Sequence, residues 1–94
     1  MLQTRVTVPE HVVYRDFPNE TVVLNLESGQ YHGLNATAAR MLEALRESDS
    51  VAAARDALAR ELEQPPDVIE RDLLVLLRSL AERGLIEQHA GPQR

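Results

Sequence analysis

Residues that often carry out chemistry are too sparse in this sequence to form a reactive group. His11, His32 and His89 are scattered, and none lies three or four positions from another metal-type ligand on one face of an element. His32 falls in a predicted exposed strand, where it is a candidate contact residue. The chain contains no cysteine, which excludes disulfides, thiolate zinc sites and cysteine nucleophiles. We therefore predict neither a metal centre nor any other cofactor.

Catalysis by a nucleophile or by paired carboxylates is equally unsupported. Serines such as Ser28 have no accompanying base. Glu61 and Glu63 lie at the wet end of a predicted helix, where we expect solvated charges. Gly29 and Gly33 belong to a turn and a strand rather than to a phosphate-binding loop. The sequence therefore predicts a protein that is not an enzyme.

The charge of the chain argues against nucleic acid as the partner. The 94 residues carry a formal net charge of −5, and all 10 basic residues are arginine. Binding to a phosphate backbone depends on charge neutralisation. The last predicted helix also begins with the acidic sequence Asp67-Val-Ile-Glu70, which would repel phosphate. A DNA-binding regulator therefore stays only as an alternative.

Hydropathy predicts a soluble, cytoplasmic protein without a membrane partner. The first nine residues lack the apolar core of a signal peptide. The longest apolar run, residues 73–77, is far too short to cross a bilayer.

The first third of the chain is typical of a small antiparallel sheet. The predicted strands are residues 11–17, 21–27 and 30–34, joined by two tight turns. Val23 is an exception in the second strand, whose other apolar residues share one face: Val22, Leu24 and Leu26. A three-stranded sheet with one wet face is not stable alone. We therefore expect helices to cover this apolar face.

Three amphipathic helices are predicted to follow the sheet. The first begins after the N-cap Asn35, and the second ends at the Pro65-Pro66 pair. The third opens at Asp67 with a capping box completed by Glu70, and Gly84 stops it just after residue 83. The short apolar segment 85–86 is expected to pair briefly with the sheet.

This order of elements, β-β-β-α-α-α, predicts an α+β fold: a three-stranded antiparallel sheet followed by three helices, similar to a winged helix. The whole chain, residues 1–94, is expected to form a single domain. Its core spans about residues 11–87, and residues 88–94 form a frayed tail.

The third predicted strand has an open edge, with unpaired N–H and C=O groups. The third predicted helix has more apolar surface than the other helices can cover, because Val68 and Val75 flank Asp72 on a border without an obvious partner. An open edge beside such a border is what the addition of an extended peptide as one more strand requires. The same border is also typical of ordinary core packing.

Two stretches of the sequence resemble the PqqD-like family. One is Tyr31-His-Gly-Leu-Asn35 followed by Ala38-Ala-Arg-Met-Leu42. The other is Val68-Ile-Glu-Arg-Asp-Leu-Leu-Val-Leu-Leu77, followed by Leu80 and Gly84-Leu-Ile86, with Asp72 in the aspartate position of the family. The similarity covers roughly residues 11–87. Within the family, the turn Glu27-Ser-Gly-Gln-Tyr31 is most similar to the stand-alone proteins of lasso peptide biosynthesis.

The resemblance implies a recognition element that binds the leader of a ribosomally made precursor peptide as a strand, between the third strand and the third helix. It also implies a partner enzyme: a separate cysteine-type leader peptidase, with the cyclase as a further candidate. We expect a monomer when the leader is bound. The candidate peptide-binding residues are Glu27, Gln30, Tyr31, His32, Gly33, Leu34, Val68, Arg71, Asp72, Val75 and Leu76.

Two alternatives to the lasso assignment stay open. The quinone-cofactor branch of the family delivers its precursor peptide to a radical SAM enzyme, and composition or periodicity does not separate the branches. The second alternative is a winged-helix regulator that binds DNA.

Overall fold

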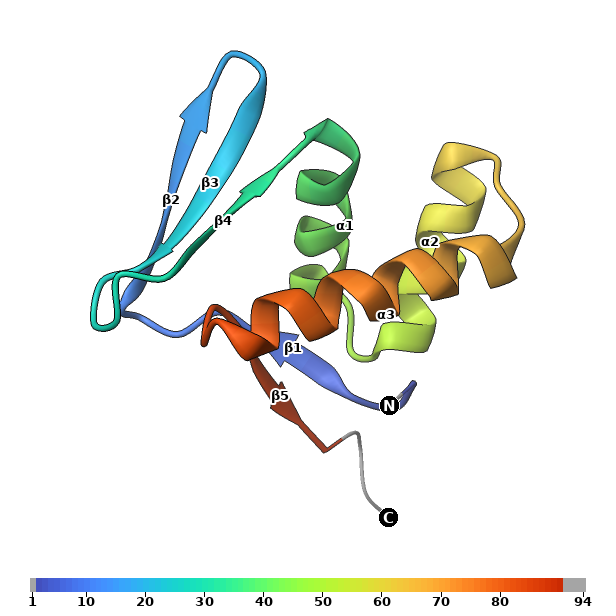
Figure 1. Cartoon of the computed structure of the whole chain (residues 1–94). Helices are drawn as coiled ribbons and strands as arrows, with labels where there is room; N and C mark the ends of the chain where they lie inside the picture. Colours follow the sequence, from blue (N-terminus) through green and yellow to red (C-terminus); the bar gives the residue numbers. More distant parts are fainter. Residues whose placement is uncertain (1, 91–94) are drawn as a thin grey trace.

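A computed structural model describes residues 2–90 and shows two small sheets and three helices (Figure 1). The strands are β1 (Arg5–Thr7), β2 (Val12–Phe17), β3 (Glu20–Asn25), β4 (Tyr31–Leu34) and β5 (Glu87–His89). The helices are α1 (Ala36–Glu47), α2 (Val51–Leu62) and α3 (Pro66–Glu82). The predicted α+β class is confirmed, as are the three-stranded antiparallel sheet and the three helices after it. The winged-helix comparison stays a prediction.

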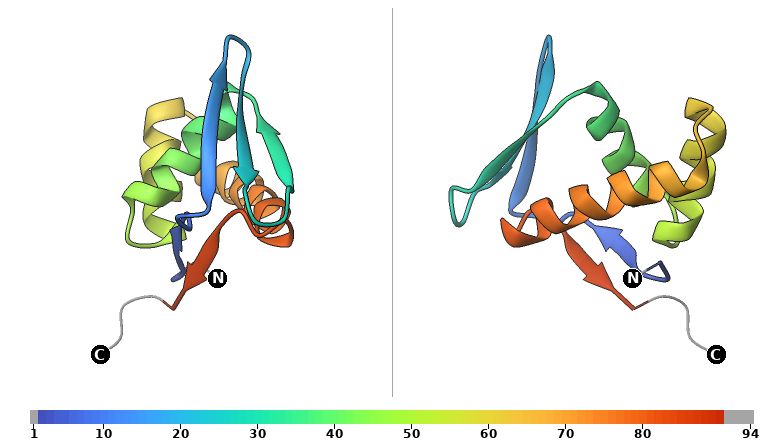
Figure 2. Two further views of the ribbon diagram at one scale, coloured as in Figure 1. Left: turned by 90° about the vertical axis from the view of Figure 1, so that its left-hand side faces the viewer. Right: turned by 45° about the vertical axis from the view of Figure 1, so that its right-hand side comes forward.

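The larger sheet is antiparallel and has the order β2-β3-β4. The helices lie together on one side of this sheet, whose hairpin β2–β3 projects beyond them (Figure 2). The sheet is therefore covered on one face and open on the other. This leaves two strands, β2 and β4, as edges.

The two ends of the described chain form a separate ribbon, β1 paired antiparallel with β5. The expected pairing of segment 85–86 with the larger sheet is wrong. Leu85 and Ile86 instead fill the core, and the chain pairs with β1 just after them. Gln88 and His89, which the sequence predicts to fray, belong to β5, whereas residues 91–94 of the predicted tail lie outside the described residues.

Side-chain caps begin both α1 and α2, and the cap of α1 is the predicted Asn35. The Asn35 side chain accepts a hydrogen bond from the N–H of Ala38 at 2.8 Å, and the Ser50 hydroxyl accepts one from Ala53 at 3.1 Å. Each bond satisfies an N–H in the first turn that has no partner within its helix. The cap at Asn35 also fixes the direct passage from β4 into α1.

The capping box predicted at the start of α3 is wrong. The helix begins one residue earlier than Asp67, with Pro66 in its first turn and Pro65 as an N-cap that makes no side-chain hydrogen bond. Proline suits this position because its fixed φ is helical and it lacks the N–H that would be unsatisfied there. Glu70 does not reach back to the cap, since its carboxylate accepts a hydrogen bond from Arg55 Nη1 at 2.8 Å and so links α2 to α3.

The core lies between the helices and the inner face of the sheet. Its largest fully buried side chains come from β1, β3, β4, the three helices and the segment after α3: Leu34, Leu42, Leu45, Leu58, Ile69, Leu73, Leu77, Leu80, Leu85, Val6, Val23 and Val51. Removing such side chains from water is the main favourable contribution to folding.

The predicted orientation of β3 is wrong. Val23 and Asn25 face the helices and are buried, whereas Leu26 is 61% exposed and Val22 and Leu24 lie on the open face. The reason is Asn25, the polar residue of the inner face that is buried. Asn25 finds partners for its amide there, so the face that carries fewer apolar residues is the one that faces the helices, with α1 packed against β3.

Asn25 joins the β3–β4 turn to the end of α3. Its Nδ2 donates to the carbonyl of Gly84 at 3.0 Å, and its Oδ1 accepts from the N–H groups of Glu27 and Ser28 at 2.9 and 3.1 Å. Gly84 has a φ of 66°, and a Cβ there would lie 3.0 Å from Asn25 Nδ2. The glycine therefore both ends the helix and allows the close approach of the amide.

Candidate functional site

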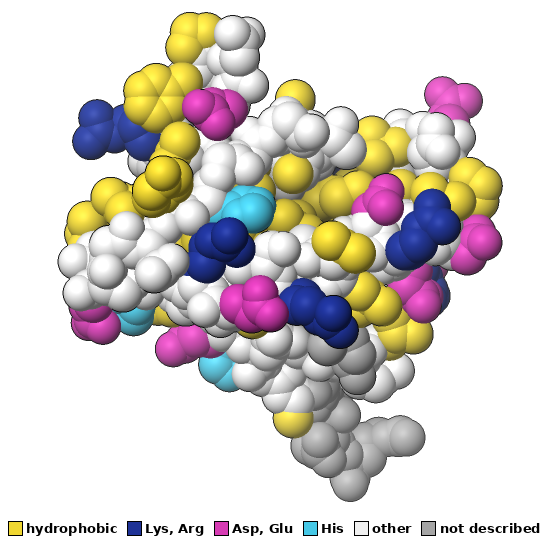
Figure 3. Space-filling view, viewed as in Figure 1, with side chains coloured by type: hydrophobic (Ala, Val, Ile, Leu, Met, Phe, Trp, Pro, Cys, Tyr) yellow, Lys and Arg dark blue, Asp and Glu magenta, His cyan; other side chains and the backbone are white. Residues whose placement is uncertain are grey.

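A groove separates β4 from α3, and the first turns of α1 close one end of it. It is lined by His32 of β4, by Asn35, Thr37, Ala38 and Met41 at the start of α1, and by Asp72, Val75, Leu76 and Ser79 of α3. The space-filling view shows hydrophobic side chains exposed in the hollow between the sheet and the helices (Figure 3). The walls are mixed, with apolar side chains between polar ones.

The α3 wall of this groove includes Asp72 and Val75 of the helix border that the sequence leaves without a partner. Val75 is 63% exposed, Asp72 is exposed, and Val68 is half-buried. A valine exposed to this extent on a well-formed helix is an unused apolar contact. Apolar surface next to convergent polar groups is the usual composition of a binding site.

The edge of β4 faces this groove and offers free backbone groups. In an antiparallel ladder, successive residues point their N–H and C=O groups alternately to one neighbour and to the other side. Asn25 N donates to Gln30 O at 2.8 Å, so Gln30 faces β3, and so do His32 and Leu34 by alternation. The N–H and C=O groups of Tyr31 and Gly33 therefore point to the open edge.

The other edge of the sheet, β2, has no comparable wall. Leu26 N donates to His11 O at 2.8 Å, which continues the ladder of β3 with β2, and the N–H of Val12 is bonded to Pro9 O at 3.1 Å. The Tyr14 ring, on the inner face of β2, is covered by the Arg46 guanidinium at 5.2 Å from the ring centroid. Among the strands of the larger sheet, β4 is the edge that runs beside exposed apolar surface of α3.

His32 brings a neutral imidazole into the groove. Its partial burial lowers the pKa of the ring below the ordinary value of 6.5, and the nearby positive charge of Arg83 lowers it further. The ring is therefore uncharged at neutral pH. Asp72 is then the carboxylate that gives the groove its charge.

Membrane-spanning or metal-binding groups are not found in the part of the chain that the structure describes. Residues 2–90 contain no group of three or more His, Cys, Asp or Glu side chains placed to hold a metal ion. Over the same residues, each helix is too short or too polar to cross a membrane.

Comparison with known proteins assigns this arrangement to a family. Residues 20–86 match the family described as coenzyme PQQ synthesis protein D, or PqqD. The match includes the larger sheet from β3 onward and all three helices. The chain belongs to the PqqD family.

Two solved structures share the fold of the chain. One is described as TbiB1 in complex with the TbiA(beta) leader peptide, with 34% sequence identity and a TM-score of 0.75 over 88% of this chain and 96% of that one. The other is lasso peptide synthetase B1 complexed with the leader peptide, with 29% identity and a TM-score of 0.76 over 88% and 98%. No curated protein sequence matches significantly. The predicted PqqD-like recognition element and its non-catalytic, accessory character are thereby confirmed.

The PqqD fold brings together four of the residues predicted to bind a peptide. His32, Asp72, Val75 and Leu76 line the groove, and Gly33 lies on the edge strand beside it. The groove also contains residues that the sequence analysis does not single out: Asn35, Thr37, Ala38, Met41 and Ser79. The sequence could have indicated the α1 residues, because positions 37, 38 and 41 share one side of a helix that begins directly after the edge strand.

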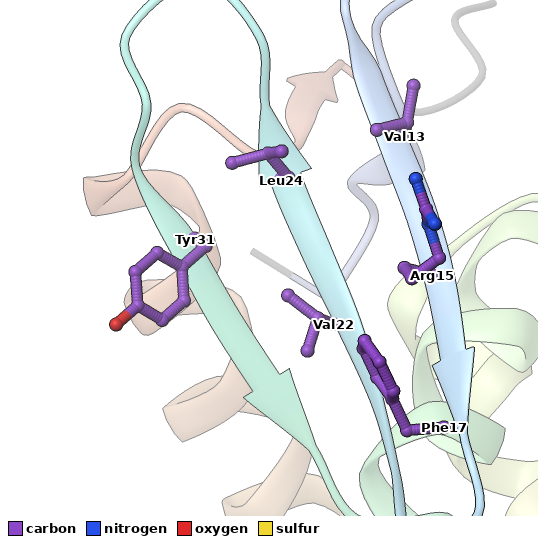
Figure 4. A pocket seen from close by; sticks show the side chains of 6 residues that line it. All are labelled: Val13, Arg15, Phe17, Val22, Leu24 and Tyr31. Carbon is purple, nitrogen blue, oxygen red and sulfur yellow. The ribbon is translucent and has the colours of Figure 1, made fainter.

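The other predicted residues lie elsewhere. Leu34 is fully buried. Gln30 and Glu27 belong to the β3–β4 turn, where Oε2 of Glu27 lies 3.7 Å from Nδ1 of His11. Tyr31 points to the outer face of the sheet rather than into the groove (Figure 4). The two remaining residues, Val68 and Arg71, lie nearer the start of α3 and do not line the groove.

The outer face of the PqqD-like sheet carries a second apolar surface. We call it the outer patch, and it consists of Val13, Arg15, Phe17, Val22, Leu24 and Tyr31 (Figure 4). Phe17 and Tyr31 are 53% and 64% exposed. Exposed aromatic residues on a sheet face are typical of interaction surfaces.

Proposed function

We propose that this protein binds the leader segment of a ribosomally synthesised precursor peptide by strand addition to β4, in the groove beside α3. The observation that carries this proposal is the free backbone of Tyr31 and Gly33 alongside the exposed Val75. The two similar structures, each described as a complex with a leader peptide, support it.

The groove suggests how affinity and specificity would be divided. Two N–H and two C=O groups of β4 supply hydrogen bonds that every peptide backbone can make. The leader residue opposite His32 would point to the inner face, where Met41, Val75 and Leu76 favour an apolar side chain. Asp72 would accept a hydrogen bond from a leader N–H or from a cationic side chain.

Amide hydrogen exchange, followed by NMR during titration with the cognate leader peptide, tests the strand addition. We expect the N–H groups of Tyr31 and Gly33 to exchange quickly in the free protein and to become at least tenfold slower when the leader is bound. The N–H of His32 is the internal control, because it faces β3 and is already protected.

A leader that binds without slowing Tyr31 and Gly33 would contradict strand addition at β4. Protection of Tyr14 and Asp16 instead would place the added strand on the β2 edge. Isothermal titration of the same peptide measures whether the leader binds at all. Leader binding and strand addition at β4 are therefore tested separately.

We further propose that the protein presents the bound leader to a separate cysteine-type leader peptidase, with the outer patch as the contact surface. A leader strand on β4 would widen the sheet, so that its own outward side chains would continue the outer patch. One partner surface would then contact the recognition element and its peptide together. The likeness to lasso peptide synthetase B1 supports a lasso pathway rather than delivery to a radical SAM enzyme.

Replacing Phe17 with Ser is expected to weaken capture of the leader peptidase by at least tenfold while leader affinity stays within twofold. The reason is the loss of an exposed aromatic side chain from the contact surface, which typically costs about 1–2 kcal/mol or more. Co-purification with the cognate cysteine-type leader peptidase, in the presence of leader peptide, is the measurement.

The control variant is Val13→Ser, at the margin of the outer patch, for which we expect a smaller loss. If Phe17→Ser captured the peptidase as well as the wild type, the outer patch would not be the presenting surface. Binding of the radical enzyme instead of a peptidase would support the other branch of the family.

A further inference from the structure

Gly33 has no side chain, and the space that a side chain would occupy is taken by Glu20. A Cβ built on Gly33 would lie 2.7 Å from Glu20 Oε1. The Glu20 side chain therefore extends from β3 to β4, and its carboxylate lies over the backbone of the edge strand. Gly33 belongs to the edge strand β4. The Glu20 side chain therefore reaches the open edge from β3, the next strand inward.

The carboxylate is on the outer face of the sheet. Glu20 pairs with Phe17 across the β2–β3 ladder and shares its face, and Gly33 pairs with Val22 on the same face. A strand added to β4 would place one residue opposite Gly33, with its side chain on this outer face and its Cβ about 5 Å from the Gly33 position. That side chain would meet the Glu20 carboxylate.

Glu20 is available for such a contact. Within residues 2–90, the Glu20 carboxylate makes neither a salt bridge nor a side-chain hydrogen bond. The cation of the same face, Arg15, extends toward Val13 and away from the Phe17 end of the sheet (Figure 4). The carboxylate is therefore the free charge at this point of the edge.

We propose that Glu20 is a specificity-determining residue that selects leader peptides with Lys or Arg at the position facing Gly33. The inference rests on the proposed strand addition at β4. A cationic side chain there would pair with the carboxylate, whereas an acidic one would be held next to a like charge and disfavoured. The preference acts on the outer face, separately from the apolar side chain that enters the groove on the inner face.

Selection from a displayed library of random peptides tests the inference independently of any particular leader sequence. The wild type, Glu20→Gln and Glu20→Arg are each used as bait, and Glu87→Arg on β5 is the matched control with the same change of charge at an exposed strand position. Val75→Asp identifies the peptides that use the groove. These are the peptides to be compared.

Among groove-dependent peptides, we expect one position at which Lys and Arg are enriched about fivefold with the wild type. That preference should disappear with Glu20→Gln, invert toward Asp and Glu with Glu20→Arg, and persist with Glu87→Arg. Gly33→Ala should weaken it as well, because the new methyl group would force the Glu20 carboxylate away.

The outcomes separate this inference from the proposed function. If peptides depend on Val75 but show the same charge preference with all Glu20 variants, the proposed role of Glu20 is overturned and the groove remains the binding site. A library that yields no peptide dependent on Val75 would overturn the groove as the binding site, and this inference with it.

Discussion

Val75→Asp is expected to reduce leader affinity by about 30-fold or more without unfolding the protein. Val75 is 63% exposed in the free protein, so a carboxylate there is solvated and leaves the core intact. In the complex, the same carboxylate would be covered by the leader and would lie one helical turn from Asp72. Burying a polar group without a partner costs about 2–3 kcal/mol, which corresponds to this loss of affinity.

Isothermal titration with the leader peptide measures the effect, and far-ultraviolet circular dichroism verifies the fold. The matched control is Ala53→Asp, which places the same charge on the exposed side of α2, away from the groove. We expect the control to bind within twofold of the wild type. Equal affinity for the leader in Val75→Asp and the wild type would remove α3 from the binding site.

Asn25→Ala is expected to lower the free energy of unfolding by about 3 kcal/mol. The variant leaves the carbonyl of Gly84 and the N–H groups of Glu27 and Ser28 without the partner that Asn25 supplies. Unsatisfied groups of this kind cost about 1–3 kcal/mol each where they are buried, and these are partly buried. Urea denaturation gives the value, with Gln88→Ala on the exposed ribbon as a control expected within 0.5 kcal/mol, roughly the size of ordinary surface effects.

The same variant is expected to weaken leader binding even where it remains folded. Asn25 holds the turn that brings the chain from β3 into β4, and that turn sets which residues of β4 face the open edge. A loosened turn lets the register of β4 vary. A slip of one residue would present the backbone N–H and C=O groups of His32 at the open edge in place of those of Tyr31. An Asn25→Ala protein with native stability and native leader affinity would show that the turn is held by other contacts.

Sequence patterns were sufficient for the larger sheet and the three helices, but not for the ribbon of β1 and β5. Alternation in residues 11–17, the N-cap at Asn35 and the stop at Gly84 are local signals, and each corresponds to a local structure that forms for the same physical reason. The start of α3 shows the limit of such signals. Asp67 and Glu70 have the spacing of a capping box, but the preceding prolines start the helix earlier, and Arg55 of another helix takes the Glu70 carboxylate.

The face of β3 could not be predicted from its own residues. Counting apolar side chains favours Val22, Leu24 and Leu26 as the inner face, and the chain buries the other face. The partner that decides this is Gly84, 59 positions away, whose carbonyl receives the Asn25 amide. A hydrogen bond between residues so distant in sequence leaves no trace in local periodicity.

The sequence by itself determined that this chain has an α+β fold, because strand alternation, helix periodicity and the order of the elements are properties of neighbouring residues. The similarity of two residue stretches to the PqqD family added the kind of domain. The sequence also indicated that the edge of residues 30–34 and the Asp72–Val75 border belong together. Only the tertiary structure decided which backbone groups of β4 are free, which side chains share the groove, and that Glu20 lies over Gly33. Those facts depend on strand register and on the packing of α1 and α3 against the sheet, which distant residues set together.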